Sequence, residues 1–171
     1  MAQIYFSGGE ISLYAVVREY LSKAQKRIWL EAFSLSSEEV IDLLKRAGSK
    51  GLDVKILLDF NSENEKLWTR NNEAKYLKWA ELKFGNPDIF WTYHLKMAIV
   101  DNYVLFGSAN WSYSGMIKNR EGIVVFDEQN ILKECEKVFS EDWKNGITKL
   151  RGVKKRSWFN ILMERLISKR K

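Results

Sequence analysis

Three chemically distinctive residues occur only once in this chain of 171 residues: one cysteine, one proline and one histidine. The single Cys135 excludes an internal disulfide and any zinc site built from several cysteines. Pro87 lies within the turn-forming segment Gly85-Asn86-Pro87-Asp88. No apolar run approaches the roughly 18 residues that a membrane-spanning helix needs. With 46% hydrophobic and 29% charged residues, the composition is that of one ordinary globular domain.

The only histidine, His94, constrains any mechanism that requires two imidazoles. Such a mechanism would have to take its second imidazole from another copy of the chain.

The N-terminus lacks a basic start followed by an apolar run, so no signal peptide is visible. We therefore expect a cytoplasmic protein, or a periplasmic or secreted one if a leader was removed beforehand.

Positive charge is concentrated at the C-terminus. Residues 149–171 contain nine Lys or Arg and one acid, whereas residues 1–148 carry 19 basic and 21 acidic groups. This division predicts one domain over 1–148 and a basic amphipathic tail over 149–171. Lys154, Lys155 and Arg156 are candidates for contacting a nucleic-acid backbone. An anionic membrane, packing against the body or a dimer partner, and a merely solvated end are the alternatives.

The apolar periodicity predicts an α/β fold with a mixed, mostly parallel sheet and helices on both of its faces. Ser36 with Glu39 forms a predicted capping box, and Asp127 is the predicted cap of the last helix. Residues 63–83 are polar with a helical stripe. The expected strands are 3–6, 27–33, 53–59, 89–93, 95–100, 103–106 and 122–126, and the expected helices are 10–24, 36–47 and 127–146.

One segment has the residue types that phosphate chemistry needs. In a strand, residues two apart share a face, so His94 and Lys96 project together, as do Ser108 and Asn110. Their convergence brings together a nucleophile or base, a cation, a hydroxyl and an amide. An imidazole can attack phosphorus while Lys and Asn bind the developing charge. One histidine with scattered acids is a poor metal-ligand set, so we expect neither metal nor cofactor.

These residues resemble the HKD motif of the phospholipase D superfamily. The pattern is His94-x-Lys96, four residues, Asp101, then Gly107-Ser108-x-Asn110, with Glu121 where that family has a further acid. The resemblance covers about residues 4–145 and implies the family's α-β-α sandwich. Because this chain carries one motif, it is similar to the family's small bacterial endonucleases, which share one active site across a homodimer.

The resemblance also implies a role for each residue. His94 of one subunit would form a phosphohistidine, and His94 of the other would protonate the leaving oxygen. Lys96 and Asn110 would bind phosphoryl oxygens with the help of Ser108, and Glu121 would orient His94. Asp101 and Gly107 would be structural.

The chain departs from the family at one point. Five residues separate Asp101 from Gly107-Ser108, where the family usually has six. A one-residue change in a hairpin arm can reverse the facing of everything that follows.

The sequence thus favours a metal-independent phosphodiesterase, a non-specific endonuclease acting on DNA, with RNA as a further candidate substrate. One rival hypothesis is a lipid enzyme that cleaves or transfers phosphatidyl groups at a membrane. Another is a nucleic-acid-binding module with little turnover. Four aromatic residues flank the motif and could stack on unpaired bases, or could simply fill the core: Trp91, Tyr93, Trp111 and Tyr113.

Overall fold

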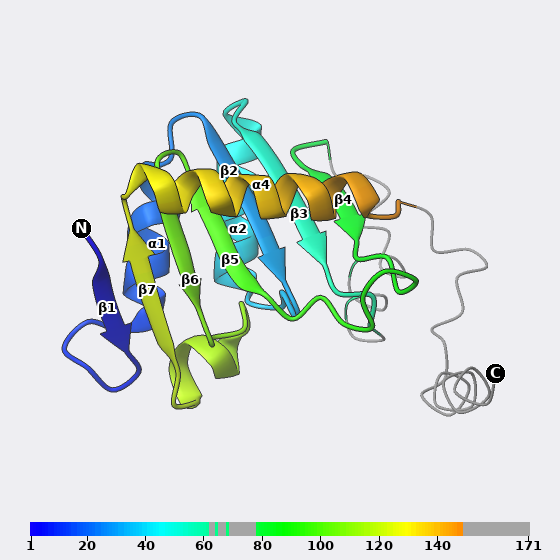
Figure 1. The fold of residues 1–171 in the computed structure, drawn as a ribbon. Helices are drawn as coiled ribbons and strands as arrows, with labels where there is room; N and C mark the ends of the chain where they lie inside the picture. The colour runs from blue at the N-terminus through cyan, green and yellow to red at the C-terminus, as the bar shows by residue number, and fades with distance from the viewer. Residues whose placement is uncertain (62–63, 65–67, 69–77, 149–171) are drawn as a thin grey trace, which may run out of the picture.

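A mixed seven-stranded sheet forms the centre of the molecule, with strand order β1-β7-β6-β5-β2-β3-β4 (Figure 1). The structure, a computed structural model, describes residues 1–61, 64, 68 and 78–148. Its elements are β1 (Gln3–Phe6), α1 (Leu13–Lys23), β2 (Arg27–Ala32), α2 (Glu38–Ser49), β3 (Asp53–Leu58), β4 (Glu81–Phe84), β5 (Lys96–Val100), β6 (Tyr103–Gly107), the π-helical turn η3 (Ser114–Lys118), β7 (Gly122–Phe126) and α4 (Gln129–Asn145).

The α/β class and the mixed sheet are confirmed, but the expectation of a mostly parallel sheet is wrong. Among the described strands only the pairs β2–β3 and β3–β4 are parallel, and the other four pairs are antiparallel. The connections explain this difference. Helix α2 carries the chain from β2 back to a parallel β3, whereas a tight turn joins β5 to β6 and can serve only antiparallel strands.

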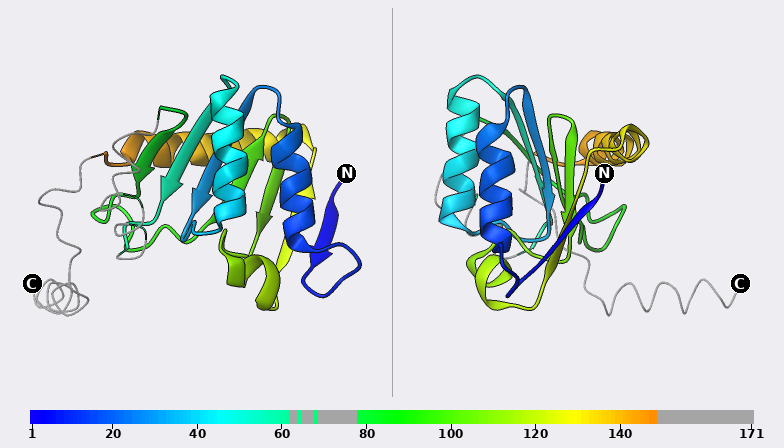
Figure 2. Two further views of the ribbon diagram at one scale, coloured as in Figure 1. Left: turned by 180° about the vertical axis from the view of Figure 1, so that it is seen from behind. Right: turned by 90° about the vertical axis from the view of Figure 1, so that its left-hand side faces the viewer.

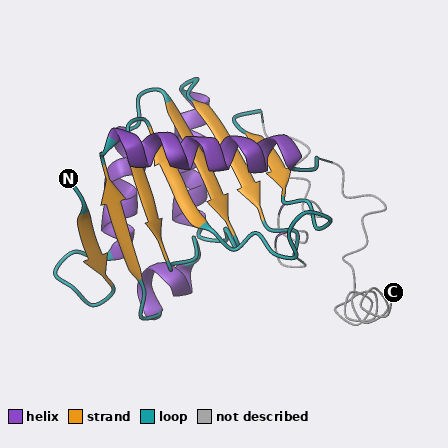
Figure 3. Ribbon diagram, viewed as in Figure 1, coloured by secondary structure: helices purple, strands orange, loops and turns teal. Residues whose placement is uncertain are grey.

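Helices cover both faces of the sheet, as predicted. Helices α1 and α2 lie side by side on one face, and α4 crosses the strands on the other (Figures 2 and 3). Successive side chains of β2 point to opposite faces of the sheet. Ile28 and Leu30 pack toward α1 and α2, whereas Trp29 stacks on Phe139 of α4 with ring centres 5.3 Å apart. Among the described helices, none combines the length and the apolar character that crossing a bilayer requires.

Two of the expected element assignments are corrected. The polar segment 63–83 ends in strand β4, which pairs with β3 through Lys55 and Glu81, so sheet pairing overrides the helical stripe. Most of the remainder of that segment lies outside the described residues. Residues 89–93 form a loop and not a strand, because the carbonyl of Asn86 accepts bonds from Ile89 and Phe90 in a turn.

Both predicted helix caps shift by one residue. Helix α2 is capped by Ser37, whose hydroxyl accepts from the Val40 amide at 3.4 Å and donates to Glu39 at 2.8 Å. Helix α4 is preceded by Glu128 as its N-cap residue, without a side-chain capping bond. Asp127 is unavailable as a cap because its carboxylate pairs with the N-terminal ammonium group.

A buried acid sits between the sheet and α4. Glu31 of β2 is 1% exposed, and its Oε2 has no hydrogen-bond partner among the described residues. Burial raises the pKa of Glu31 to about 8, and the nearby Asp142 of α4 adds to the rise. Burial likewise raises the pKa of Asp142, helped by Glu141. Glu31 is therefore protonated in the folded protein at neutral pH.

This protonation predicts a pH-dependent stability. An unfolded Glu31 loses its proton near pH 4.5, whereas the folded one keeps it to about pH 8. The free energy of unfolding should therefore fall as the pH rises between these values, by up to ~1.4 kcal/mol per pH unit from this group. Glu31→Gln should flatten that slope in urea titrations at several pH values. Glu134→Gln, exposed on α4, is the matched control, and a slope unchanged in Glu31→Gln would contradict the assignment.

Candidate active site

The predicted site residues gather at one edge of the sheet, the lower edge in Figure 1. Strand β5 begins at Lys96, β6 ends at Gly107 and β7 begins at Gly122. Because these neighbouring strands alternate in direction, the residues just outside these ends lie at the same edge. His94, Ser108 and Glu121 are therefore neighbours in space although they are far apart in the chain.

Lys96 directly contacts His94. Its Nζ lies 2.8 Å from Nδ1 and 3.1 Å from Nε2 of the imidazole, and it donates to the His94 carbonyl oxygen at 2.7 Å. The His94 ring also packs on Phe33, with ring centres 4.7 Å apart. The ammonium therefore lies beside both ring nitrogens, so a phosphate reached by the imidazole would also meet this cation.

Lys96 is a buried cation beneath an exposed imidazole. Lys96 is only 6% exposed, whereas His94 is exposed to solvent. Burial lowers the pKa of Lys96, while the negative charges of Glu121 and Asp59 oppose that change. The two carboxylates thus help to keep the ammonium charged. A charged ammonium in a low-dielectric setting binds an anion more strongly than an exposed one does.

Ser108 and Glu121 are joined by a hydrogen bond. The Ser108 hydroxyl donates to Oε2 of Glu121 at 2.5 Å and accepts from the Gly122 amide at 3.2 Å. Asn119 donates to the other carboxylate oxygen at 3.3 Å. Within the described residues of one chain, no hydrogen bond joins Glu121 to His94. The role of Glu121 in orienting that imidazole therefore stays a prediction.

Gly107 is required by the close approach of β6 and β7. A Cβ at this position would lie 2.1 Å from the Gly122 carbonyl oxygen and 3.0 Å from the Ile123 Cα. Any side chain would push apart the two strands that carry Ser108 and Glu121. The close approach of the two strands therefore explains why glycine occupies position 107.

Asn110 lies on the side of the site that faces η3. It lines a cavity of about 330 Å³, and its Oδ1 is buried with no partner among the described residues. Buried polar atoms are rarely left unpaired, and the exceptions often mark functional sites. Gly115 of η3 permits the close packing here, since a Cβ would lie 2.3 Å from the Asn110 carbonyl oxygen.

Asp101 lies at the opposite edge, in the turn between β5 and β6. Its carboxylate accepts from the backbone amides of Gln25, Lys26 and Arg27 at 2.8, 2.9 and 3.0 Å. Burial favours the neutral acid, but these donors outweigh it and hold the pKa of Asp101 below its usual value. Asp101 is far from His94 along the strands and anchors the hairpin to the start of β2.

The short Asp-to-Gly spacing is accommodated by that turn. Val100 pairs with Tyr103, so only Asp101 and Asn102 form the connection, and Asp101 adopts a left-handed φ of 52°. The register then places Met97 opposite Phe106. His94 and Ser108 consequently end at the same edge of the sheet despite the missing residue.

The flanking aromatic residues divide into two groups. Trp111 and Tyr93 are only 2% and 3% exposed, so neither can stack on a base, and the assignment of Trp111 to nucleic-acid contact is wrong. Their rings fill the core beside the site. Trp91 and Tyr113 remain about half exposed. Lys154, Lys155 and Arg156 lie outside the described residues.

Sequence reasoning missed the end of β2 as a wall of the site. Phe33 contacts the His94 ring and lies under the Lys96 ammonium, 5.4 Å from its ring centre. Ser34 follows in the same cavity as Asn110. The position could have been found, because β2 antiparallel to β5 places its C-terminal end beside the start of the motif strand. Among the described residues, no group of three or more His, Cys, Asp or Glu side chains could hold a metal ion.

An open mixed sheet that presents a His-Lys pair at its edge defines the phospholipase D class of fold and site. A family profile described as "Cardiolipin synthase, PLD-like domain" matches residues 17–143. The chain belongs to the phospholipase D superfamily, whose members act on phosphodiester bonds.

Curated relatives are about a quarter identical to the chain over the aligned residues. Mitochondrial cardiolipin hydrolase of Chlamydomonas reinhardtii is 22% identical over 126 residues, covering 73% of this chain and 55% of the relative. Phospholipase D of Rickettsia typhi is 25% identical over 131 residues, covering 75% and 62%. The chain thus spans little more than half the length of these relatives.

Solved structures share the fold. Nuc of Salmonella typhimurium, a phospholipase D family member, superposes with a TM-score of 0.72 at 24% identity, covering 86% of this chain and 96% of Nuc. NucT of Helicobacter pylori gives 0.68 at 15% identity, covering 86% and 99%.

Gly115→Ala tests whether η3 positions Asn110. The added methyl group cannot be accommodated without moving the Asn110 backbone, and overpacking of this kind costs about 1–3 kcal/mol. We expect a lower thermal midpoint together with a shifted amide resonance of Asn110. Ile117→Ala, on an exposed position of the same turn, should change neither. A Gly115→Ala protein with the wild-type midpoint and resonance would refute the positioning.

Proposed function

We propose that the protein is a metal-independent phosphodiesterase, a non-specific endonuclease of DNA with RNA as a further candidate substrate, that works as a homodimer. The observation that carries this proposal is the contact of the buried Lys96 ammonium with the exposed His94 imidazole. Ser108 and Glu121 lie at the same sheet edge. A cation, hydroxyl and nucleophile at one accessible point match the needs of phosphoryl transfer.

The reaction needs two imidazoles, and each chain supplies one. The lone pair of one His94 forms a bond to phosphorus, and the bond from phosphorus to the leaving oxygen breaks. The second His94, protonated, gives its proton to that oxygen. A water then attacks phosphorus, its proton passes to the second imidazole, and the N–P bond breaks. Lys96 and Asn110 bind the phosphoryl oxygens.

The distribution of charge supports the assignment to nucleic acid. The nine basic residues within 149–171 give the chain a polycationic segment suited to a polyanion.

A lipid substrate is the second candidate. The relatives named cardiolipin hydrolase and phospholipase D favour it. So does the loop just before the motif, where Ile89, Phe90 and Trp91 are about half exposed and could enter a lipid surface.

Digestion in excess chelator tests the activity. We expect plasmid and single-stranded DNA to be cleaved with chelator present, and His94→Ala to lose on the order of 1,000-fold in rate because the nucleophile is gone. Lys133→Met, on the distant α4, is the control and should cleave normally. Headgroup release from phospholipid vesicles with the nucleic acid left intact would overturn the nuclease in favour of the lipid enzyme. DNA binding without cleavage would favour a binding module.

The shared site predicts that activity follows dimer formation. Light scattering across a dilution series should show a dimer, and the specific activity should fall where the dimer dissociates. Mixing in an excess of His94→Ala should reduce wild-type activity further, because mixed dimers hold one imidazole. A monomer that retains full specific activity would rule out the shared site.

A further inference from the structure

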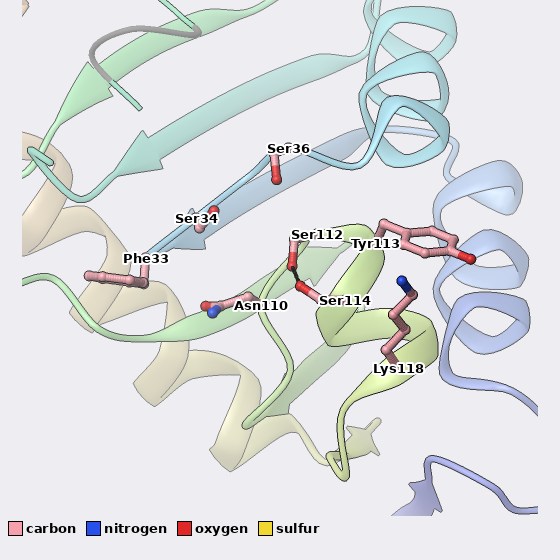
Figure 4. Close-up of a pocket in the computed structure, with 8 residues that line it drawn as sticks. All are labelled: Phe33, Ser34, Ser36, Asn110, Ser112, Tyr113, Ser114 and Lys118. Carbon is pink, nitrogen blue, oxygen red and sulfur yellow. Dashed lines mark hydrogen bonds between the residues drawn. The ribbon is translucent and has the colours of Figure 1, made fainter. Parts of the chain in front are cut away.

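A polar cavity opens beside the reacting residues, and of its lining only Asn110 takes part in the chemistry described above. Its volume is about 330 Å³, within the range of small-molecule sites. Its polar lining comes from the loop after β2, from the segment before η3 and from η3 itself (Figure 4). These side chains are Ser34, Ser36, Asn110, Ser112, Ser114 and Lys118.

The cavity begins at the catalytic residues. Phe33 forms one end, and the same ring packs against the His94 imidazole at 4.7 Å between centres. Asn110, a predicted ligand of the phosphate under attack, lies on its wall. Figure 4 shows Lys118 and Tyr113 at the end away from Phe33. A substrate held at His94 can therefore extend into this space.

The lining selects for an oxyanion. Its polar groups are the hydroxyls of four serines and of Tyr113, one amide and one ammonium, and no carboxylate is among the lining residues. Lys118 forms no ion pair with any residue that the structure describes, and its Nζ lies 5.2 Å from the Tyr113 ring centre. No hydrogen bond among the described residues occupies the Ser34 or Ser36 hydroxyl. These donors and the cation match a phosphate group.

We propose that this cavity is a subsite for the phosphate next to the one that is cleaved, on the same nucleic-acid strand. The inference rests on the proposed function and adds to it the way in which the substrate is held. Lys118 supplies the charge, and the serine hydroxyls bind phosphate or sugar oxygens. A strand anchored at two consecutive phosphates presents the first one to His94 without any contact to a base, so cleavage is independent of base sequence.

Chromogenic esters with one and two phosphates test the subsite. The one-phosphate substrate is thymidine 5′-(p-nitrophenyl phosphate), and its partner carries an added 3′-phosphate. A second pair has the reacting ester at the 3′ position, with and without a 5′-phosphate, and covers the opposite strand direction. We expect the added phosphate to raise kcat/KM about tenfold in one of the two pairs. In Lys118→Met the gain should shrink to less than twofold, and in Ser36→Ala to an intermediate value.

The controls separate this inference from the proposed function. Lys133→Met should keep the wild-type gain. Hydrolysis of the one-phosphate esters, abolished in His94→Ala, tests the phosphodiesterase alone. If those esters are hydrolysed but the added phosphate brings no gain in either pair, or if the gain survives in Lys118→Met, the subsite is refuted while the activity stands. If a second phosphate raises kcat/KM on a lipid substrate and on neither nucleotide pair, the nucleic-acid assignment is overturned.

Discussion

The three hydrogen bonds that Asp101 accepts from the backbone of residues 25–27 are the constraint on which the site depends. They fix the turn of the β5–β6 hairpin to the beginning of β2. With that end fixed, the ladders between β2, β5 and β6 determine which residues reach the opposite edge. His94 and Phe33 meet there, and Ser108 arrives beside Glu121. Asp101 thus affects the site without touching it, because it fixes the register of the strands whose ends hold the site residues.

Two buried titratable side chains, Lys96 and Glu31, lie in different electrostatic environments in the sheet. At the site edge the buried Lys96 must stay charged, and Glu121 and Asp59 supply the compensating field. On the α4 face Glu31 has no such compensation and remains protonated. Both side chains belong to adjacent strands, and Ala32 rather than Glu31 pairs with Lys96. Their side chains therefore do not form an ion pair, and the ammonium contacts the His94 imidazole and carbonyl oxygen instead.

The sequence predicted the site better than it predicted the sheet. His94 and Lys96 were found because their spacing is a local property of the sequence, and the structure places them in contact although His94 lies just before β5. The strand β4 was missed because the alternation of its four residues, Glu-Leu-Lys-Phe, is too short to outweigh the helical stripe that precedes it, and pairing with β3 decides its conformation. Trp111 was misassigned because side-chain burial depends on packing that residue spacing does not reveal. The cavity beside Asn110 combines two segments about 75 residues apart, so no local pattern could indicate it.

The contact at Gly107 limits where this enzyme fold can diversify. With the Gly122 carbonyl 2.1 Å from any added Cβ, the ends of β6 and β7 cannot accept a new side chain there without separating. The cavity-facing serines and Lys118 instead belong to the loop after β2 and to the segment that ends in η3. On the subsite proposed above, substitutions at Ser36 and Lys118 would change substrate preference while the strand ends that hold the reacting group stay in place. For protein engineering, the strand ends at Gly107 are therefore the part to keep unchanged, and the cavity residues are the part to vary.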